Sequence, residues 1–184
     1  MLGDPAVAEV ALQPASYHHR WRALFPSMTA EQRSAANSLL VEHHQLVLPA
    51  DKAPCSRSAG KLVGLWPHIH TAAMLIGAAK HPHSAMAHRD YLRASPWIRG
   101  FMQMGFSRAV VRSPQPMGSE DLRAWGGAYL TTGLASDLPH WLVQRLPLIF
   151  PPNATPGVES EPFDYDCLWS ALHHAKSIAR HSTR

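Results

Sequence analysis

Apolar side chains in this chain recur at the spacing of an α-helix, and no segment alternates between apolar and polar residues as a half-buried strand does. The clearest helical pattern lies between Asp121 and Pro152, where Leu122, Trp125 and Tyr129 share one helical face. We therefore expect a mostly α fold, in the form of a single compact multi-helix domain of about six to seven helices with little or no sheet.

The stretch from Asp121 to Pro152 predicts two helices joined by a short break. Ser119 is a suitable N-cap for the first helix. The second helix is expected to begin at Ser136 or Asp137 and to end before Pro151, because proline has no amide hydrogen and clashes with the preceding turn. We interpret this stretch as a packed helical hairpin without catalytic residues.

Other helices follow from the same periodicity and from capping signals. Thr29 and Gln32 form a capping box, which predicts a helix over about residues 30–48. The most apolar helix is expected over 61–80, where Pro67 either kinks it or marks the first turn of a new helix. Its small residues would allow a close approach of another helix, as would Gly126. Further helices are expected at about 84–93, 97–111 and 163–181, and a short one before Pro26.

The length of 184 residues suits one domain, perhaps with a small appendage. We expect an N-terminal segment over residues 1–27 and a helical domain over 28–184. Clusters of small residues and prolines predict loops near 49–60, 112–118 and 151–162.

Composition narrows the functional classes. Charged residues make up 16% of the chain, against about 25% in a typical soluble domain. This deficit suggests that part of the surface is covered by a partner. The net charge is +4, but the basic residues form no run, which disfavours nucleic acid as a partner.

The cysteine count and the N-terminus point to the cytoplasm. Cys55 and Cys167 provide neither a disulfide framework nor a zinc-binding spacing, so two free thiols in a reducing compartment are expected. Asp4 and Glu9 do not fit an export signal. No uninterrupted apolar run approaches the roughly 18 residues of a membrane span. Any association with a membrane is therefore expected to come through a partner.

Histidines suggest one alternative class, a histidine-dependent metalloenzyme. The candidate ligands are His68, His70, His81, His83 and His88. Side chains at i and i+2 diverge by about 200° on a helix, so His68 and His70 cannot face one ion from a helix. Polar helix faces and loops are the simpler interpretation. A helical regulatory or nucleic-acid-binding module is a second alternative.

Tryptophans occur about once per predicted helix, and most are expected in the core. Because tryptophan and arginine are enriched at binding hot spots, the best partner-binding candidates are the pair Trp141 and Arg145, followed by Trp21 with Arg20 and Arg22. Whether Trp141 faces the core or a partner stays open at this point, and no residue is assigned to catalysis, to a cofactor or to a metal.

Three segments carry a resemblance to a known family. They are Leu65-Trp66-Pro67 leading into the small-residue helix Ala72–Gly77, the segment Leu138–Leu148 (LPHWLVQRLPL), and Tyr17-His18 followed by Trp21. In these segments the chain resembles the SctK (YscK-like) cytosolic proteins of bacterial type III secretion systems.

This resemblance implies a function without enzymatic chemistry. Proteins of this family are helical adaptors of the cytoplasmic sorting platform, and they link the inner-membrane ring component SctD to the pod protein SctQ. The resemblance thus implies a non-enzymatic adaptor without a cofactor, located in the cytoplasm and peripheral to the inner membrane through an SctD-like and an SctQ-like partner.

Overall fold

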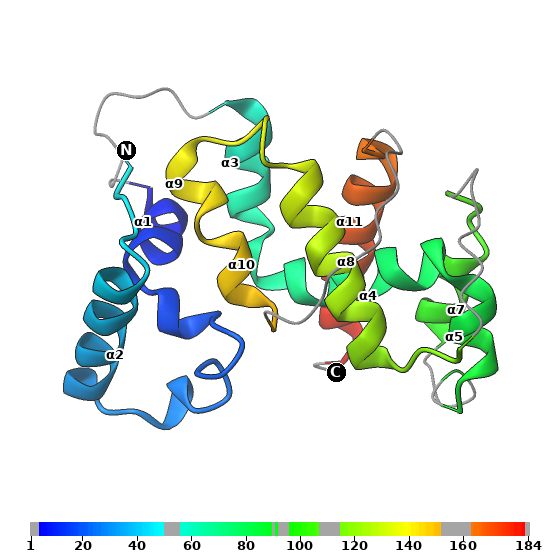
Figure 1. Ribbon diagram of the computed structural model, residues 1–184, viewed down its shortest axis with the longest axis horizontal. Coiled ribbons are helices and arrows are strands. Elements are labelled where there is room, and N and C mark those ends of the chain that lie inside the picture. Colours follow the sequence, from blue (N-terminus) through cyan, green and yellow to red (C-terminus); the bar gives the residue numbers. More distant parts are fainter. Residues whose placement is uncertain are drawn as a thin grey trace. The chain divides into compact units, whose positions relative to one another are not determined.

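The computed structural model describes residues 4–49, 56–89, 91, 96–106, 115–151 and 163–182, and every regular element within these ranges is helical (Figure 1). The mostly α prediction is thereby confirmed. The α-helices are α1 (Pro5–Leu12), α2 (Ala30–His43), α3 (Arg57–Gly64), α4 (Ile69–Lys80), α5 (Pro82–Ala87), α7 (Pro96–Met102), α8 (Ser119–Gly133), α9 (His140–Val143), α10 (Leu146–Ile149) and α11 (Tyr165–Ser182). The 3-10 helices are η1 (Pro14–Ser16), η2 (Phe25–Ser27) and η3 (Trp66–His68).

The chain divides into two compact units. Unit 1 consists of Met1–Pro67 and Leu134–Pro152, and unit 2 consists of His68–Gly133 and Asn153–Arg184. The predicted helical hairpin is thus divided, because α8 belongs to unit 2 whereas α9 and α10 belong to unit 1. The predicted division at residue 27 stays a prediction.

Several predicted features fall outside the described ranges. They are Cys55 and most of the residues in the predicted loops near 49–60, 112–118 and 151–162. Within the described part, residues 57–60 were predicted as loop and are helical, because Ser56 caps α3 by accepting a hydrogen bond from the Ala59 amide at 3.2 Å.

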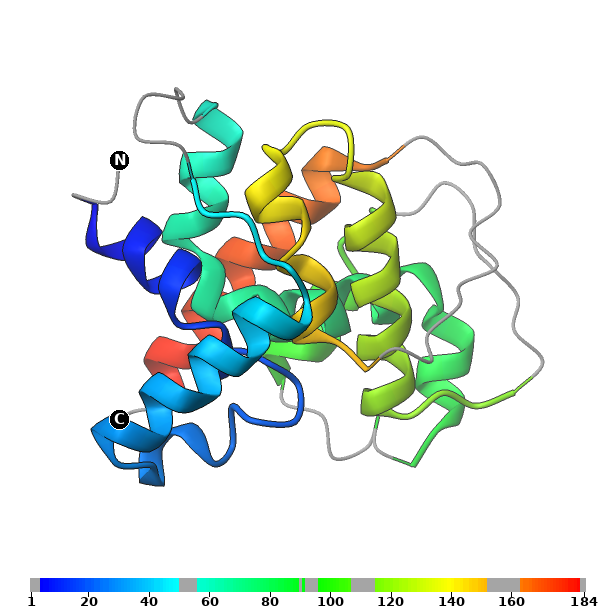
Figure 2. The same ribbon diagram turned by 60° about the vertical axis from the view of Figure 1, so that its left-hand side comes forward.

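Unit 1 begins with α1, which the sequence did not predict (Figure 2). Asp4 caps this helix by accepting a hydrogen bond from the Ala6 amide at 2.9 Å, and Pro5 occupies the first turn. The helix buries Val7 and Val10 together with Ala11. Three buried residues in eight positions are too few to produce a periodicity that can be read in the sequence.

The short helix predicted before Pro26 is wrong. The chain there forms isolated turns between η1 and η2. The amide of His19 donates a hydrogen bond to the Leu148 carbonyl at 2.8 Å and not to the preceding turn. A contact far along the chain has therefore replaced a local helical hydrogen bond.

Helix α2 begins as predicted. The Gln32 amide donates to Thr29 Oγ1 at 3.2 Å, and the Thr29 amide donates to Gln32 Oε1 at 2.9 Å, so the capping box is confirmed.

Helix α2 ends at His43, earlier than predicted. Gln45 has a left-handed φ of 49°. Its amide donates to the Glu42 carbonyl at 3.2 Å, and the Leu46 amide donates to the Val41 carbonyl at 2.9 Å. These two bonds form a Schellman motif, which normally has glycine where Gln45 stands. The absence of glycine explains why the sequence did not indicate this end.

The helix predicted between Ser136 and Pro151 is divided into α9 and α10. Pro147 lies in the first turn of α10. Because proline has no amide hydrogen, it cannot donate to the Val143 carbonyl, and the α-helical ladder stops between the two short helices. Pro67 has a similar place, in the 3-10 helix η3 that separates α3 from α4.

Helix α4, which forms the later part of the apolar helix predicted over 61–80, is the centre of unit 2. It contacts α5, α7, α8 and α11 (Figure 1), and Ile69, Leu75 and Ile76 are almost fully buried. The closest approach is to α8. A Cβ on Gly77 would lie 2.0 Å from the Leu122 carbonyl oxygen, and a Cβ on Gly126 would lie 1.9 Å from the Ala73 carbonyl oxygen. The predicted role of Gly126 in close helix packing is confirmed.

A carboxylate accepts a main-chain hydrogen bond at the N-terminal end of α8 and of α11. Ser119 is not the cap of α8, because the first turn of the helix includes it, and the Gly118 amide donates to Asp121 Oδ2 at 3.1 Å. Asp164 caps α11 by accepting a hydrogen bond from the Cys167 amide at 2.9 Å.

No single helix among the described residues is long and apolar enough to cross a membrane, although α3 and Trp66–Lys80, taken as a bent pair, have the required length and composition.

The α4–α8 crossing generates a prediction about stability. Gly77→Ala and Gly126→Ala should each lower the free energy of unfolding by about 1–3 kcal/mol, because a methyl group would collide with backbone that cannot turn aside. Gly60→Ala is the matched control on α3, since nothing lies within 4 Å of its Cβ position and alanine favours a helix by up to about 1 kcal/mol. Urea unfolding followed by circular dichroism measures both. Equal effects of the three substitutions would contradict the close approach.

Candidate functional site

The predicted partner-binding pair Trp141 and Arg145 lies inside unit 1. Arg145 is fully buried, and the side chain of Trp141 is 6% exposed. The guanidinium carbon of Arg145 lies 5.4 Å from the centroid of the Trp141 ring, which is within the range of a cation–π contact. The structure therefore favours the core position for Trp141, and a direct part of this pair in partner binding stays a prediction.

Arg145 donates hydrogen bonds to four main-chain carbonyl groups. Its Nε donates to Val10 at 3.1 Å, and its two terminal nitrogens donate to Ala11 at 2.8 Å, to Val47 at 2.9 Å and to Trp141. An arginine side chain has five N–H donors, so four of them are used. These bonds connect the end of α1, the segment that follows α2, and α9.

The groups around Arg145 favour the positive charge of its buried side chain. Val10 and Ala11 lie in the last turn of α1, where the helix dipole places partial negative charge and favours a cation. Burial lowers the pKa of Arg145, while the neighbouring Tyr17 acts to raise it. The Tyr17 hydroxyl donates to the same Val10 carbonyl at 2.8 Å. Burial raises the pKa of Tyr17, so its hydroxyl stays protonated at neutral pH.

Gln144 adds a second connection to the segment after α2. Its Oε1 accepts a hydrogen bond from the Val47 amide at 2.8 Å, and its Nε2 donates to the Gln45 carbonyl at 3.5 Å. Gln144 and Arg145 together therefore form hydrogen bonds with main-chain groups of Gln45 and Val47, which follow α2 and belong to no helix. The sequence offered no signal for either contact, because their partners lie about a hundred residues away.

The second predicted group, Trp21 with Arg20 and Arg22, lies at the surface of unit 1. Trp21 is half-buried against a small core made by Ala15, Ala36 and Leu40. Arg20 and Arg22 are both exposed. This group offers two guanidinium groups around a fixed aromatic side chain, which is a composition common at protein interfaces.

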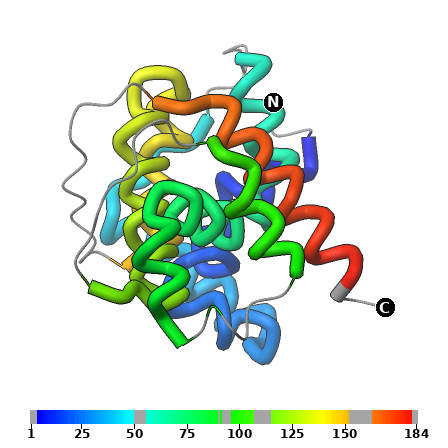
Figure 3. The backbone as a smooth tube through the Cα atoms, turned by 90° about the vertical axis from the view of Figure 1, so that its right-hand side faces the viewer, coloured from blue at the N-terminus to red at the C-terminus, as the bar shows by residue number. Residues whose placement is uncertain are grey.

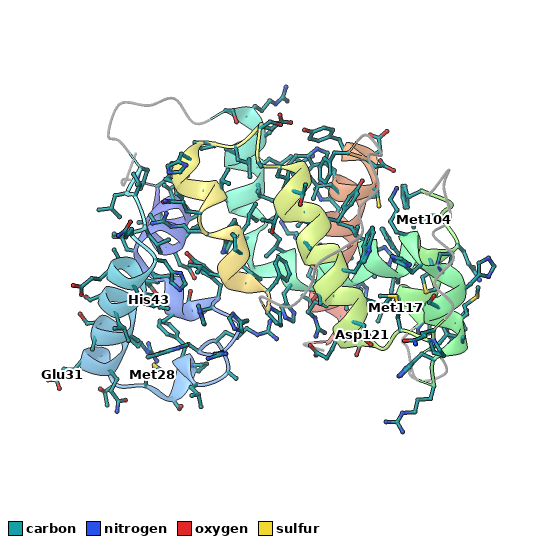
Figure 4. The ribbon with its side chains drawn as sticks, in the orientation of Figure 1. Met28, Glu31, His43, Met104, Met117 and Asp121 are labelled. Carbon is teal, nitrogen blue, oxygen red and sulfur yellow. The ribbon has the colours of Figure 1, made fainter. Side chains whose placement is uncertain are left out.

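Four histidines gather beside these arginines, and they come from two pairs of adjacent residues, His18 with His19 and His43 with His44. The ring centroids of His18 and His19 are 4.4 Å apart, those of His18 and His44 are 6.2 Å apart, and those of His43 and His44 are 4.8 Å apart. His43 is at the C-terminal end of α2 (Figure 4). The two pairs are separated by a turn and a whole helix, so only the fold brings them together.

The innermost ring of this histidine group is His18. Its Nδ1 accepts a hydrogen bond from the Arg20 amide at 3.2 Å, which requires an unprotonated nitrogen. Burial, together with the positive charges of His19, His44 and Arg20, lowers the pKa of His18 to about 4. Burial and the neighbouring His43 and His19 also lower the pKa of His44. His18 is therefore a neutral structural ring at neutral pH.

The histidines of the metalloenzyme alternative do not form a ligand set in the described part of the chain. No group of three or more His, Cys, Asp or Glu side chains in that part is arranged to hold a metal ion. His81 is buried in a T-shaped contact with Trp125, and the two ring centroids are 4.5 Å apart. His83 is exposed on α5, and His68 directly precedes α4.

Cys167 is buried and lies at the start of α11. Burial raises its pKa to about 12, the charge of Asp164 raises it too, and Lys80 acts in the opposite direction. The thiol is therefore protonated at neutral pH, and a protonated thiol is a poor nucleophile.

Comparison with known proteins identifies a family. The family model described as bacterial type III secretion apparatus protein (OrgA_MxiK) matches residues 7–177. No curated protein and no solved structure matches the chain.

The Arg145 hydrogen bonds generate a second prediction about stability. Arg145→Met keeps much of the side-chain volume but removes four hydrogen bonds to main-chain carbonyl groups, although the Val10 carbonyl retains the Tyr17 hydroxyl as a donor. The free energy of unfolding should therefore fall by about 3–5 kcal/mol. The matched control is Arg57→Met on α3, where the side chain is exposed and the change should stay within about 0.5 kcal/mol. Tryptophan fluorescence during urea unfolding measures the difference. A loss below about 1 kcal/mol for Arg145→Met would contradict this role.

Proposed function

Because the chain belongs to the OrgA_MxiK family of bacterial type III secretion apparatus proteins, we propose that it is a non-enzymatic adaptor of the cytoplasmic sorting platform. In this role the chain connects an SctD-like inner-membrane ring protein to an SctQ-like pod protein, needs no cofactor, and reaches the inner membrane only through those partners. The family match carries the proposal, since it spans residues 7–177 and thus includes parts of both units.

The surface of unit 1 supports the proposal. Trp21 is held in place by the small core beneath it, so the flanking Arg20 and Arg22 extend from a rigid base. A rigid base limits the conformational entropy that an interface side chain loses on binding. Guanidinium groups also suit the recognition of carboxylates, because they donate paired hydrogen bonds in a fixed plane.

The composition supports the same proposal. Only 16% of the residues are charged, and the exposed large apolar side chains of unit 1 include Leu24 and Leu39 at 59% and 54% exposed. A protein with few charges and several exposed apolar side chains gains from being covered in an assembly.

The test is binding of the two purified candidate partners from the same secretion system, namely the cytosolic region of the ring protein and the pod protein. The wild-type chain should retain each of them in a co-purification experiment. Arg20→Glu combined with Arg22→Glu should weaken the binding of one partner at least about tenfold, because both side chains are exposed and the charge is reversed.

The matched control is Arg57→Glu combined with Lys61→Glu, which makes the same change in charge on an exposed part of α3 in the same unit. Its binding should equal that of the wild type. Retention of neither partner by the wild-type chain overturns the adaptor proposal, whereas wild-type binding by the Arg20 and Arg22 variant removes these two residues from the interface.

A further inference from the structure

The Trp21 group consists of Arg20, Trp21 and Arg22, and its main chain depends on one neighbouring residue. The Trp21 amide donates a hydrogen bond to the His18 carbonyl at 3.0 Å, and the Arg22 amide donates to the same carbonyl at 2.9 Å. The Arg20 amide donates to Nδ1 of the His18 ring at 3.2 Å. This turn lies between α1 and α2, in the blue part of the chain in Figure 3. All three amides of the Trp21 group are therefore bonded to His18.

The turn that carries the Trp21 group has little regular structure around it. Residues 17–24 belong to no helix, and the side chains of Arg20 and Arg22 are exposed. His19 fixes one end of the turn to α10, because its amide donates to the Leu148 carbonyl at 2.8 Å. Segments with few buried contacts open locally at a low cost in free energy. The loss of one contact is therefore enough to shift the balance between a closed turn and an open one.

The hydrogen bond from the Arg20 amide requires a neutral His18 ring. A protonated imidazole has an N–H donor on each nitrogen and no acceptor, so Nδ1 could no longer accept from an amide. The His18 side chain is also only 6% exposed. A charge at this position is costly, because burial removes it from water. Protonation of His18 therefore favours the open turn on both counts.

The groups around the His18 ring oppose its protonation. His19 and Arg20 lie in the same turn, and the ring centroids of His18 and His19 are 4.4 Å apart. At the end of α2, the His44 ring centroid is 6.2 Å from that of His18 and 4.8 Å from that of His43. Helix α10, which the turn contacts, has no titratable side chain. The groups that act on the His18 charge, namely His19, His44 and Arg20, are all basic.

The direction of the pH dependence follows from these surroundings. Burial and the neighbouring positive charges lower the pKa of His18 to about 4, against about 6.5 for an ordinary histidine. The ring of an open turn therefore takes up a proton at a pH at which the ring of a closed turn does not. The closed turn has its full stability above about pH 6.5 and loses stability as the pH falls from there toward about 4. At about pH 5 the equilibrium is shifted about thirtyfold toward the open turn.

Proton uptake is the property that the four clustered histidines share. The histidine group consists of four rings, namely His18, His19, His43 and His44. Among the residues that the structure describes, no three His, Cys, Asp or Glu side chains are arranged to hold a metal ion, so metal binding does not account for the group. Histidine is the side chain whose charge ordinarily changes just below neutral pH.

We propose that the histidine group is a pH-sensitive switch for partner binding by the Trp21 group. At neutral pH the closed turn holds Trp21 against its small core, with Arg20 and Arg22 beside it. In mild acid the turn opens, the three side chains lose their fixed arrangement, and the partner is released. This proposal rests on the proposed adaptor function and adds the regulation of its candidate binding site.

Hydrogen exchange of the full chain tests the opening without a partner. In the wild type, the protection factors of the three amides of the Trp21 group should fall about thirtyfold between about pH 7.5 and about pH 5. His18→Asn should keep its protection at both pH values, because the asparagine side-chain oxygen accepts from the Arg20 amide and does not titrate. The matched control is His140→Asn, which changes an exposed histidine of α9 in the same unit and should respond like the wild type.

Isothermal titration calorimetry at the same two pH values tests the regulation. The partner of the Trp21 group is the one that the Arg20→Glu and Arg22→Glu variant loses. The wild-type affinity for this partner should fall at least about threefold in acid, because only the closed fraction of the chain binds. The affinity of His18→Asn should not fall. Both chains meet the same partner protein, so a difference between them reports on His18. Circular dichroism in acid verifies that each variant is folded.

The outcomes separate this proposal from the adaptor function. If the wild-type chain binds neither partner at about pH 7.5, the adaptor function fails and its regulation fails with it. If both partners bind but neither depends on Arg20 and Arg22, only the switch fails. The switch alone also fails if wild-type protection or affinity is the same at both pH values, or if His18→Asn loses as much as the wild type. Should His18→Asn not fold, His18→Phe replaces it, since phenylalanine cannot be protonated either, and a loss in acid equal to that of the wild type overturns the switch.

Discussion

The buried guanidinium of Arg145 is the interaction on which unit 1 depends. Helices α9 and α10 have four residues each, and helices this short do not persist without tertiary contacts. Arg145 lies between them and donates to carbonyl groups of α1, of α9 and of the segment after α2. One side chain thus joins three stretches of chain that are far apart in the sequence, and the fully buried charge is satisfied by main-chain oxygens without a carboxylate in the described contacts.

Local features of the fold could be predicted from the sequence, and long-range ones could not. The capping box of Thr29 and Gln32 and the close-packing role of Gly126 were readable because the relevant residues carry their own signals. The end of α2 was misplaced because Gln45 adopts a conformation that usually belongs to glycine. Arg145 was predicted to bind a partner, since sequence patterns cannot distinguish an arginine that is exposed from one whose acceptors lie about a hundred residues away.

The functional features follow the same division. Membership in a type III secretion apparatus family was indicated by apolar helical segments and is confirmed by the family match. The orientation of surface side chains could not be predicted in this way, because it depends on tertiary contacts. Trp21 is oriented by the small core of unit 1, and Trp97 is held by histidines of α11 in unit 2.

In the adaptor role that we propose, the chain holds both partners at the same time. Sedimentation velocity of the purified chain mixed with the cytosolic region of the ring protein and with the pod protein measures this directly. We expect a single species that contains all three proteins and sediments faster than either complex of two. If the two partners displace each other, so that only complexes of two proteins are found, the chain is not an adaptor between them.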